Sequence, residues 1–156
     1  MKWYEIIGLL GSLVSIMAAI YTSRYSTIVK KTKNEILSLF KVVKFSNISE
    51  TTQTVLEQIK KVAHKQTISR GTNLNDLVNS LNNYYEKIFK LKTENEVAKN
   101  EKLNSLIETF RLKTDTLSAT QRDQQSAIIE LFNELYQLTL NIDQEFNKLT
   151  KSIVEK

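Results

Sequence analysis

Basic side chains gather in the stretch "KKVAHKQTISRGTN", residues 60–73, which also holds the only histidine of the 156-residue chain. On a helix, Lys61 and Lys65 share one face, as do Lys60 and His64. The free N–H groups that open a following helix attract anions. Arg70 adds a fork of donors that suits a phosphate group. The stretch therefore predicts a site for an anion, suited to a phosphate-bearing ligand, with Asn73 as a polar reader. The candidate ligand-binding residues are Lys60, Lys61, His64, Lys65, Arg70, Thr72 and Asn73.

The same stretch also has a purely structural interpretation. Basic residues in the last turn of a helix interact favourably with the helix dipole, and glycine commonly ends a helix. Gly71 would then end one helix just after Arg70, and Thr72 or Asn73 would cap the next helix. Both interpretations stay open at the level of the sequence.

Chemistry other than binding has little support in the sequence. The chain has no cysteine, a single histidine, no Gly-x-x-x-x-Gly-Lys phosphate loop and no dinucleotide-binding glycine pattern. A zinc site needs several cysteines or histidines, and P-loop chemistry needs the glycine-rich loop. A single histidine removes most acid–base constellations and leaves only carboxylate chemistry, which residue spacing does not test. We therefore expect a protein that is not an enzyme, with no metal site and no cofactor.

The N-terminal residues have the composition of a membrane span. The 18 residues between Glu5 and Arg24 are uncharged and mostly apolar, close to the roughly 20 residues with which a helix crosses a bilayer. Aromatic residues at both ends suit the two interfaces. We predict a transmembrane anchor over residues 1–23. The alternatives are a cleaved signal peptide and a buried core helix.

Charge predicts the orientation of this anchor. One lysine precedes it, and four basic residues follow it closely: Arg24, Lys30, Lys31 and Lys33. The positive-inside rule places the N-terminus outside and residues 24–156 in the cytoplasm, as in a single-pass protein of the cell inner membrane. Residues 24–46 would form a basic juxtamembrane helix that anionic lipid headgroups attract. The absence of cysteine agrees with a reducing compartment.

Small residues recur four positions apart within the predicted anchor. This spacing lets helix backbones approach closely in a bilayer, which favours association between spans, although it also arises by chance where small residues are common. We predict a homo-oligomer joined through Gly8, Gly11, Ser12, Ser15 and Ala19.

Residues 47–156 show helical periodicity and no strand pattern. We therefore predict an all-α protein, with one transmembrane helix followed by a cytoplasmic helical bundle of four to five helices. The first helix would continue beyond the bilayer and break at "SNISE", residues 46–50. There, Asn47 and Glu50 have the spacing of a capping box that opens the next helix.

Two further helices follow in the predicted bundle. One has an apolar stripe over residues 74–91 that includes Tyr84 and Tyr85, whose rings could stack on nucleobases or pack into the core. The other covers residues 103–117, and a second capping box over residues 118–121 would open the last helix.

The last predicted helix has the most regular pattern. Its apolar positions alternate steps of four and three, which is the seam of helices that pack at shallow crossing angles. Packing within a bundle is favoured, and packing between chains is the alternative. The seam consists of Ile128, Phe132, Leu135, Thr139, Ile142, Phe146, Leu149 and Ile153.

The layout of the chain resembles that of small membrane-anchored effectors of bacterial antiphage defence, in particular type III CRISPR ancillary proteins whose cytoplasmic helical domain binds a cyclic oligoadenylate. The span "EIIGLLGSLVSIMAAIYTSR", the basic connection after it and the α-helical domain of modest size carry this resemblance. It covers the whole chain at the level of architecture and implies a cyclic oligonucleotide as partner, besides membrane lipid. The ligand contacts named above rest on charge alone, and we expect no DNA partner.

Two functions are consistent with these features. The first is an oligomeric membrane effector whose cytoplasmic domain binds a nucleotide second messenger, cyclic oligoadenylate, and acts on the membrane in antiphage defence. The second is a membrane-tethered scaffold or assembly protein that recruits a partner helix through the C-terminal heptad seam.

Overall fold

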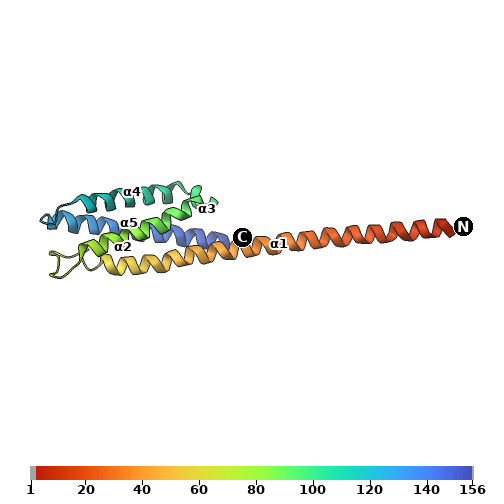
Figure 1. Cartoon of the computed structure of the whole chain (residues 1–156), viewed down its shortest axis with the longest axis horizontal. Helices are drawn as coiled ribbons and strands as arrows, with labels where there is room; N and C mark the ends of the chain where they lie inside the picture. The colour runs from red at the N-terminus through yellow and green to blue at the C-terminus, as the bar shows by residue number, and fades with distance from the viewer. Residues whose placement is uncertain (1–2, 156) are drawn as a thin grey trace. The chain divides into compact units, whose positions relative to one another are not determined.

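The computed structural model describes the backbone of residues 3–155 and the side chains of residues 15–155. Every regular element in this part of the chain is helical (Figure 1), so the predicted all-α class is confirmed. The chain divides into two compact units, Met1–Phe40 and Lys41–Lys156. The elements are α1 (Trp3–Ile59), α2 (Leu74–Lys90), the 3-10 turn η1 (Leu91–Thr93), α3 (Asn95–Ala98), α4 (Glu101–Ala119) and α5 (Gln125–Val154).

The first unit consists of the N-terminal part of α1. Within the part of the chain that the structure describes, no helix is long and apolar enough to cross a membrane. The predicted anchor, residues 1–23, falls largely on residues 1–14, whose side chains lie outside the described part.

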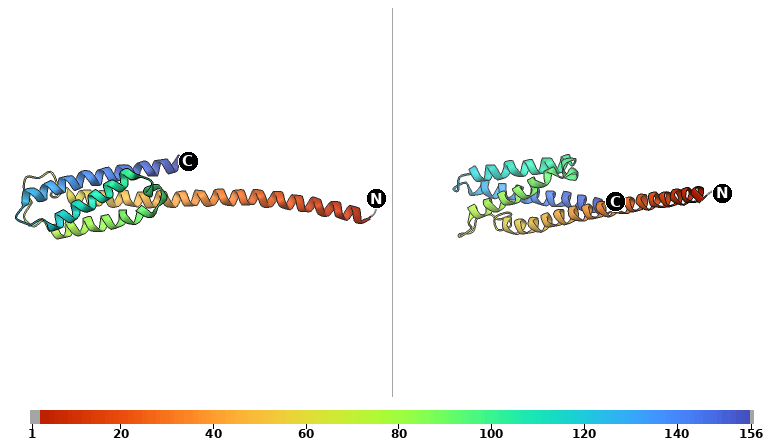
Figure 2. Two further views of the ribbon diagram at one scale, coloured as in Figure 1. Left: turned by 90° about the horizontal axis from the view of Figure 1, so that it is seen from above. Right: turned by 45° about the vertical axis from the view of Figure 1, so that its right-hand side comes forward.

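The second unit is a helical bundle. The C-terminal part of α1 lies beside α2 and α5, and α4 packs against α2 and α5 on the other side of the bundle (Figure 1 and Figure 2). Aromatic rings join these helices in the core: Phe45 of α1 packs on Phe146 of α5, with ring centroids 5.6 Å apart, and Tyr84 of α2 meets Phe110 of α4 edge-on at 5.5 Å. The predicted bundle is therefore present, with one short helix, α3, in a connection.

Polar contacts fix α1 against its neighbours within the bundle. Thr52 is fully buried, and its hydroxyl group donates to the carbonyl oxygen of Ile48. Because that hydroxyl has a single hydrogen, the buried Tyr84 hydroxyl, 3.0 Å away, is the donor to Thr52. Burial raises the pKa of Tyr84, so the phenol stays protonated and keeps this donor. On the side of α5, Ser49 Oγ donates to Asp143 Oδ1 at 2.8 Å.

The predicted break at residues 46–50 is wrong, because α1 runs unbroken to Ile59. The polar residues of this stretch lie mainly on the outer face, whereas Phe45, Ile48 and Thr52 are buried one helical turn apart. The apolar stripe therefore passes straight through the stretch, and no glycine or proline interrupts the helix. The polar run is one face of a continuous helix.

The predicted capping box over residues 118–121 is also wrong. Ser118 lies in α4, and its hydroxyl group donates back to the carbonyl oxygen of Thr114 at 2.9 Å. Helix α5 begins later, at Gln125, without a side-chain cap. The predicted seam of α5 is confirmed as a packing surface inside the bundle, since its residues from Ile128 to Phe146 are buried.

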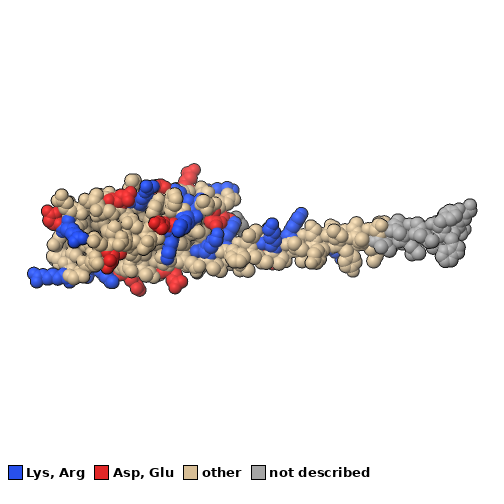
Figure 3. Space-filling view, in the orientation of Figure 1, with Lys and Arg blue, Asp and Glu red and all other residues tan. Residues whose placement is uncertain are grey.

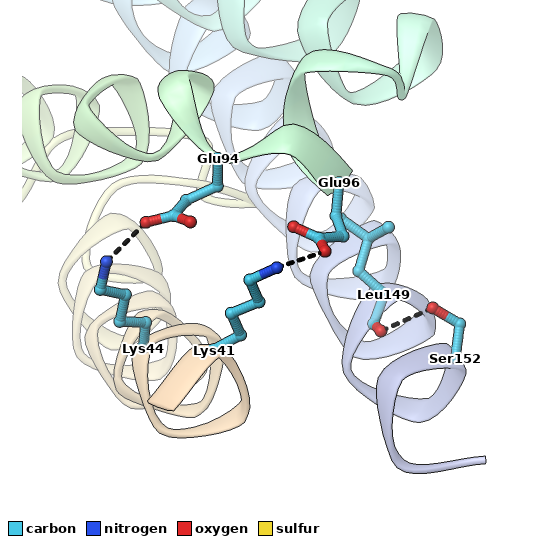
Figure 4. Close-up of polar contacts among 6 residues, drawn as sticks. All are labelled: Lys41, Lys44, Glu94, Glu96, Leu149 and Ser152. Carbon is cyan, nitrogen blue, oxygen red and sulfur yellow. Dashed lines mark hydrogen bonds and ion pairs between the residues drawn. The ribbon is translucent and has the colours of Figure 1, made fainter. Parts of the chain in front are cut away.

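The connection between α2 and α4 is held to α1 by ion pairs. Lys41 Nζ lies 2.6 Å from Glu96 Oε1, and Lys44 Nζ lies 2.5 Å from Glu94 Oε1 (Figure 4). Both carboxylates are partly shielded from solvent, with side-chain exposures of 28% and 22%, which strengthens such pairs relative to fully exposed ones. Two salt bridges thus attach η1 and α3 to the part of α1 that enters the bundle.

Acid stability should depend on Glu145. This buried carboxylate accepts hydrogen bonds from Lys148 Nζ at 2.8 Å and Lys102 Nζ at 2.9 Å, which lower its pKa from 4.5 to about 2. A lowered folded-state pKa stabilises the fold above pH 4.5, and this contribution is lost as the pH falls through about 2. The Glu145→Gln variant should therefore have a lower melting temperature than the parent at pH 7. Its melting temperature should also fall less steeply as the pH is lowered toward 2. Glu86→Gln, at an exposed site without an ion pair among the described contacts, should behave like the parent.

Candidate anion-binding pocket

The stretch of residues 60–73 is the loop that joins α1 to α2, at one end of the bundle (Figure 1). Helix α1 ends at Ile59, so the prediction that the helix extends to Arg70 is wrong. The chain turns there because Val62 and Ala63 bury their side chains in the core, and their N–H groups both donate to the Ile59 carbonyl oxygen. Burial of these two small apolar residues fixes the start of the loop.

The histidine and the glycine of this loop have a conformational property in common. His64 has φ of +61° and Gly71 has φ of +90°, and they are the only residues with positive φ in the described part of the chain. Tertiary contacts hold His64 in its positive-φ conformation. Its N–H donates to Asn133 Oδ1 at 2.6 Å, and its ring lies edge-on to the ring of Tyr136, with centroids 5.0 Å apart. Gly71 adopts its positive φ without a Cβ clash, but it does not end a helix as predicted, because α1 already ends at Ile59.

Asn73 caps α2, as the structural interpretation predicts. Its Oδ1 accepts from the N–H groups of Asn75 at 3.2 Å and Asp76 at 3.4 Å. These bonds use N–H groups that the sequence interpretation left free for an anion, and Asp76 adds a negative charge in the same turn. The helix start therefore offers an anion less than we expected, and Asn73 retains only its amide N–H₂ for a ligand.

A pocket of about 560 Å³ lies between the end of α1, the loop and the start of α2. It brings together five of the seven predicted ligand-binding residues: Lys61, Lys65, Arg70, Thr72 and Asn73. Its remaining lining residues are Gln58, Ser69, Gly71, Asp76 and Leu77. Among these, Asp76 was recognisable in the sequence as an acidic residue of the first turn of α2, whereas Gln58 became part of the pocket only through the position of the loop.

Two predicted ligand-binding residues lie elsewhere. Lys60 Nζ sits over the ring of Tyr136, 5.9 Å from its centroid, and His64 packs on the same ring. Both therefore face α5, and His64 lines a different hollow of about 510 Å³ together with Lys113 and Asn133. The helical spacing that grouped Lys60 and His64 with the site does not hold, because this segment is a loop.

The pocket has an excess of positive charge. Lys61, Lys65 and Arg70 are exposed, and no ion pair among residues 15–155 involves any of them. Other lysines of the bundle, such as Lys92 and Lys113, have glutamate partners at 2.6 and 2.8 Å. Figure 3 shows basic side chains projecting at the loop end of the bundle. Three cations against one carboxylate make this pocket an attractive site for an anion.

The other predicted residues have separate outcomes. Tyr84 belongs to the core, and Tyr85 packs against Phe89 with ring centroids 5.5 Å apart. Neither tyrosine lines the pocket, so neither can stack on a base of a ligand bound there.

Ser15 and Ala19 lie on α1, while Gly8, Gly11 and Ser12 fall among the residues whose side chains lie outside the described part. Association through this row of small residues stays a prediction. Within residues 15–155, no group of three metal-ligating side chains comes together.

No protein-family model, no curated protein and no solved structure matches the chain.

Proposed function

We propose that the protein is a non-enzymatic membrane effector whose helical domain binds a phosphate-bearing nucleotide in the pocket of the α1–α2 loop. The observation that carries this proposal is the set of three cations, Lys61, Lys65 and Arg70, which line one pocket without an acidic partner among the described ion pairs. The predicted anchor over residues 1–23 would hold this domain at the membrane.

The lining of the pocket suits a nucleotide better than a bare phosphate ion. Arg70 offers a planar fork of donors, and Lys61 and Lys65 offer point charges for phosphate oxygens. Asp76 would repel a phosphate placed beside it but accepts a hydrogen bond from a ribose hydroxyl group. The volume of about 560 Å³ lies within the range of roughly 300–1,000 Å³ that is usual for small-molecule sites.

Cyclic oligoadenylate is the ligand that the resemblance in layout favours. Such a ring repeats one phosphate and one ribose around its axis, so several copies of this chain could each supply one pocket to it. Binding would then bring the helical domains of several copies together on one ligand. The change would pass through α1 to the predicted anchors, and the effect on the membrane would serve antiphage defence.

The scaffold alternative is less well supported by the position of α5. The seam from Ile128 to Phe146 is buried in the bundle of its own chain, which leaves only the half-buried Leu149 and Ile153 beyond it for a partner. Isothermal titration of the detergent-solubilised full-length chain with cyclic oligoadenylates separates the two functions. The effector should give saturable binding, and a scaffold should give no heat.

The orientation of the anchor is a prediction of its own. Because Arg24, Lys30, Lys31 and Lys33 follow the predicted span, the C-terminal domain should stay in the cytoplasm. A reporter that is active only in the cytoplasm, fused after Lys156, should therefore work. Activity of an exported reporter alone at this position would reverse the orientation and exclude a cytoplasmic ligand.

A further inference from the structure

Four of the exposed apolar side chains in the first unit lie on one line along the helix. Tyr25, Val29, Ile36 and Leu39 have relative exposures of 72, 48, 48 and 63%. With Thr32 between them, these positions alternate steps of four and three, which is a heptad seam. The unit that contains them, Met1–Phe40, consists of the single helix α1 in its described part. A helix with an exposed apolar face obtains most of its stability by packing that face against a partner.

We propose that this seam, defined as Tyr25, Val29, Thr32, Ile36 and Leu39, joins two copies of the chain in a parallel coiled coil. In the heptad notation, Val29 and Ile36 occupy a positions, and the other three residues occupy d positions. Val29 and Ile36 are β-branched residues at a, and Leu39 is a leucine at d, which is the combination that favours two parallel strands. Thr32 is the polar member of the seam, and polar core residues are known to fix the register of such pairs at some cost in stability.

The charged residues of this segment lie outside the a and d positions of the seam. Arg24, Lys30 and Lys31 occupy b and c positions, on the side that faces solvent in a two-stranded coil. Lys33 and Glu35 occupy the flanking e and g positions, and no charged residue stands at a or d from residue 25 to 39. The exposed side chains of Ile28 and Phe40 border the seam at g and e, and they would widen the contact between two copies.

The sequence continues the same register back into the predicted anchor. Steps of three and four lead from Tyr25 through Thr22, Ala18 and Ser15 to Gly11, so a row of small residues precedes the apolar seam on one side of the chain. Small residues permit close approach of spans. Two anchors inserted in the same direction are necessarily parallel, and for this direction the inference rests on the proposed membrane attachment. A second copy is therefore the occupant that fits the whole length of the seam.

Oxidative cross-linking tests the seam directly, because the chain has no cysteine of its own. The full-length chain would carry one cysteine at a time at each position from 25 to 39, in vesicles of phosphatidylethanolamine and phosphatidylglycerol. Disulfide dimers should peak at positions 25, 29, 32, 36 and 39 and should be weak at 27, 31, 34 and 38. A flat profile, a peak confined to the middle of the segment, or no dimers at all would overturn the parallel coil.

A matched pair of substitutions tests whether packing at the seam drives association. Ile36 and Leu37 are neighbours with the same exposure of 48%, but only Ile36 lies in the seam. In the Thr32→Cys chain, Ile36→Lys should lower the dimer yield at least about fivefold, because lysine is disfavoured at an a position, and Leu37→Lys should leave it nearly unchanged. Equal losses would indicate that lipid, not a second copy, covers this face. Neither experiment contains a ligand, so a negative result for the seam would leave the proposed nucleotide binding by the pocket untouched.

Discussion

Replacing Phe132 with alanine should destabilise the helical bundle by about 3–5 kcal/mol, the usual cost of removing a buried aromatic ring. Phe132 is fully buried in α5, in the middle of the seam that packs against the other helices of its own chain. Since small domains are stable by only about 5–15 kcal/mol, this loss is a large fraction of the stability of the bundle. Urea unfolding followed by circular dichroism would measure the change.

Phe89 provides the matched control for this substitution. It has the same side chain in the same unit, but it is 45% exposed on α2, so Phe89→Ala should cost less than about 1 kcal/mol. If both variants lost the same stability, or if Phe132→Ala unfolded like the parent, the α5 seam would not form the core of the bundle. The alternative in which this seam packs between chains would then return.

Removing two cations from the loop pocket should abolish most of the binding of cyclic oligoadenylate. A hydrogen bond to a charged group contributes roughly 1.5–3 kcal/mol, and 1.4 kcal/mol corresponds to a tenfold change in affinity. The Lys65→Ala/Arg70→Ala chain should therefore bind at least about a hundredfold more weakly than the parent. Both residues are exposed and lack ion-pair partners among the described contacts, so the melting temperature should stay near that of the parent.

Lys87→Ala is the control for loss of positive charge. Lys87 is an exposed lysine of α2 outside the lining of the pocket. If only the overall positive charge of the domain attracted the ligand, each lost cation would weaken the affinity by a similar factor, whether or not it lines the pocket. We expect Lys87→Ala to bind like the parent. Comparable losses in the two variants would mean that binding follows the net charge of the domain and not this pocket.

The helical periodicity of the sequence was sufficient to predict the fold class and the bundle, because buried positions such as Phe110, Phe132 and Phe146 recur at helical spacing. It failed at residues 46–50, where a polar run is only the outer face of a continuous helix. Cap residues are common in helix interiors as well as at helix starts, so their spacing alone does not mark a boundary. Whether the helix continues through such a stretch depends on its buried residues, here Ile48, which keeps the apolar face continuous.

The candidate site was predictable as a stretch of chain but not as a geometry. Charge pointed to residues 60–73, and Gly71 does have a positive φ, but this stretch is a loop and not the end of a helix. The helical spacing assumed for Lys60 and His64 was wrong, because burial of Val62 and Ala63 ends α1 early and turns those two side chains toward α5. Tertiary burial of this kind depends on residues far along the chain, among them Asn133 and Tyr136, which a local pattern does not reveal.

Hydrogen–deuterium exchange of the full-length chain, with and without cyclic oligoadenylate, tests the central claim most directly because it locates the ligand on the chain. Amide exchange should slow in the segments that line the pocket, from Gln58 to Leu77, and should stay unchanged in α4. Protection confined to another part of the chain would contradict the assignment of the site, and the absence of protection at saturating ligand would contradict the proposed function itself.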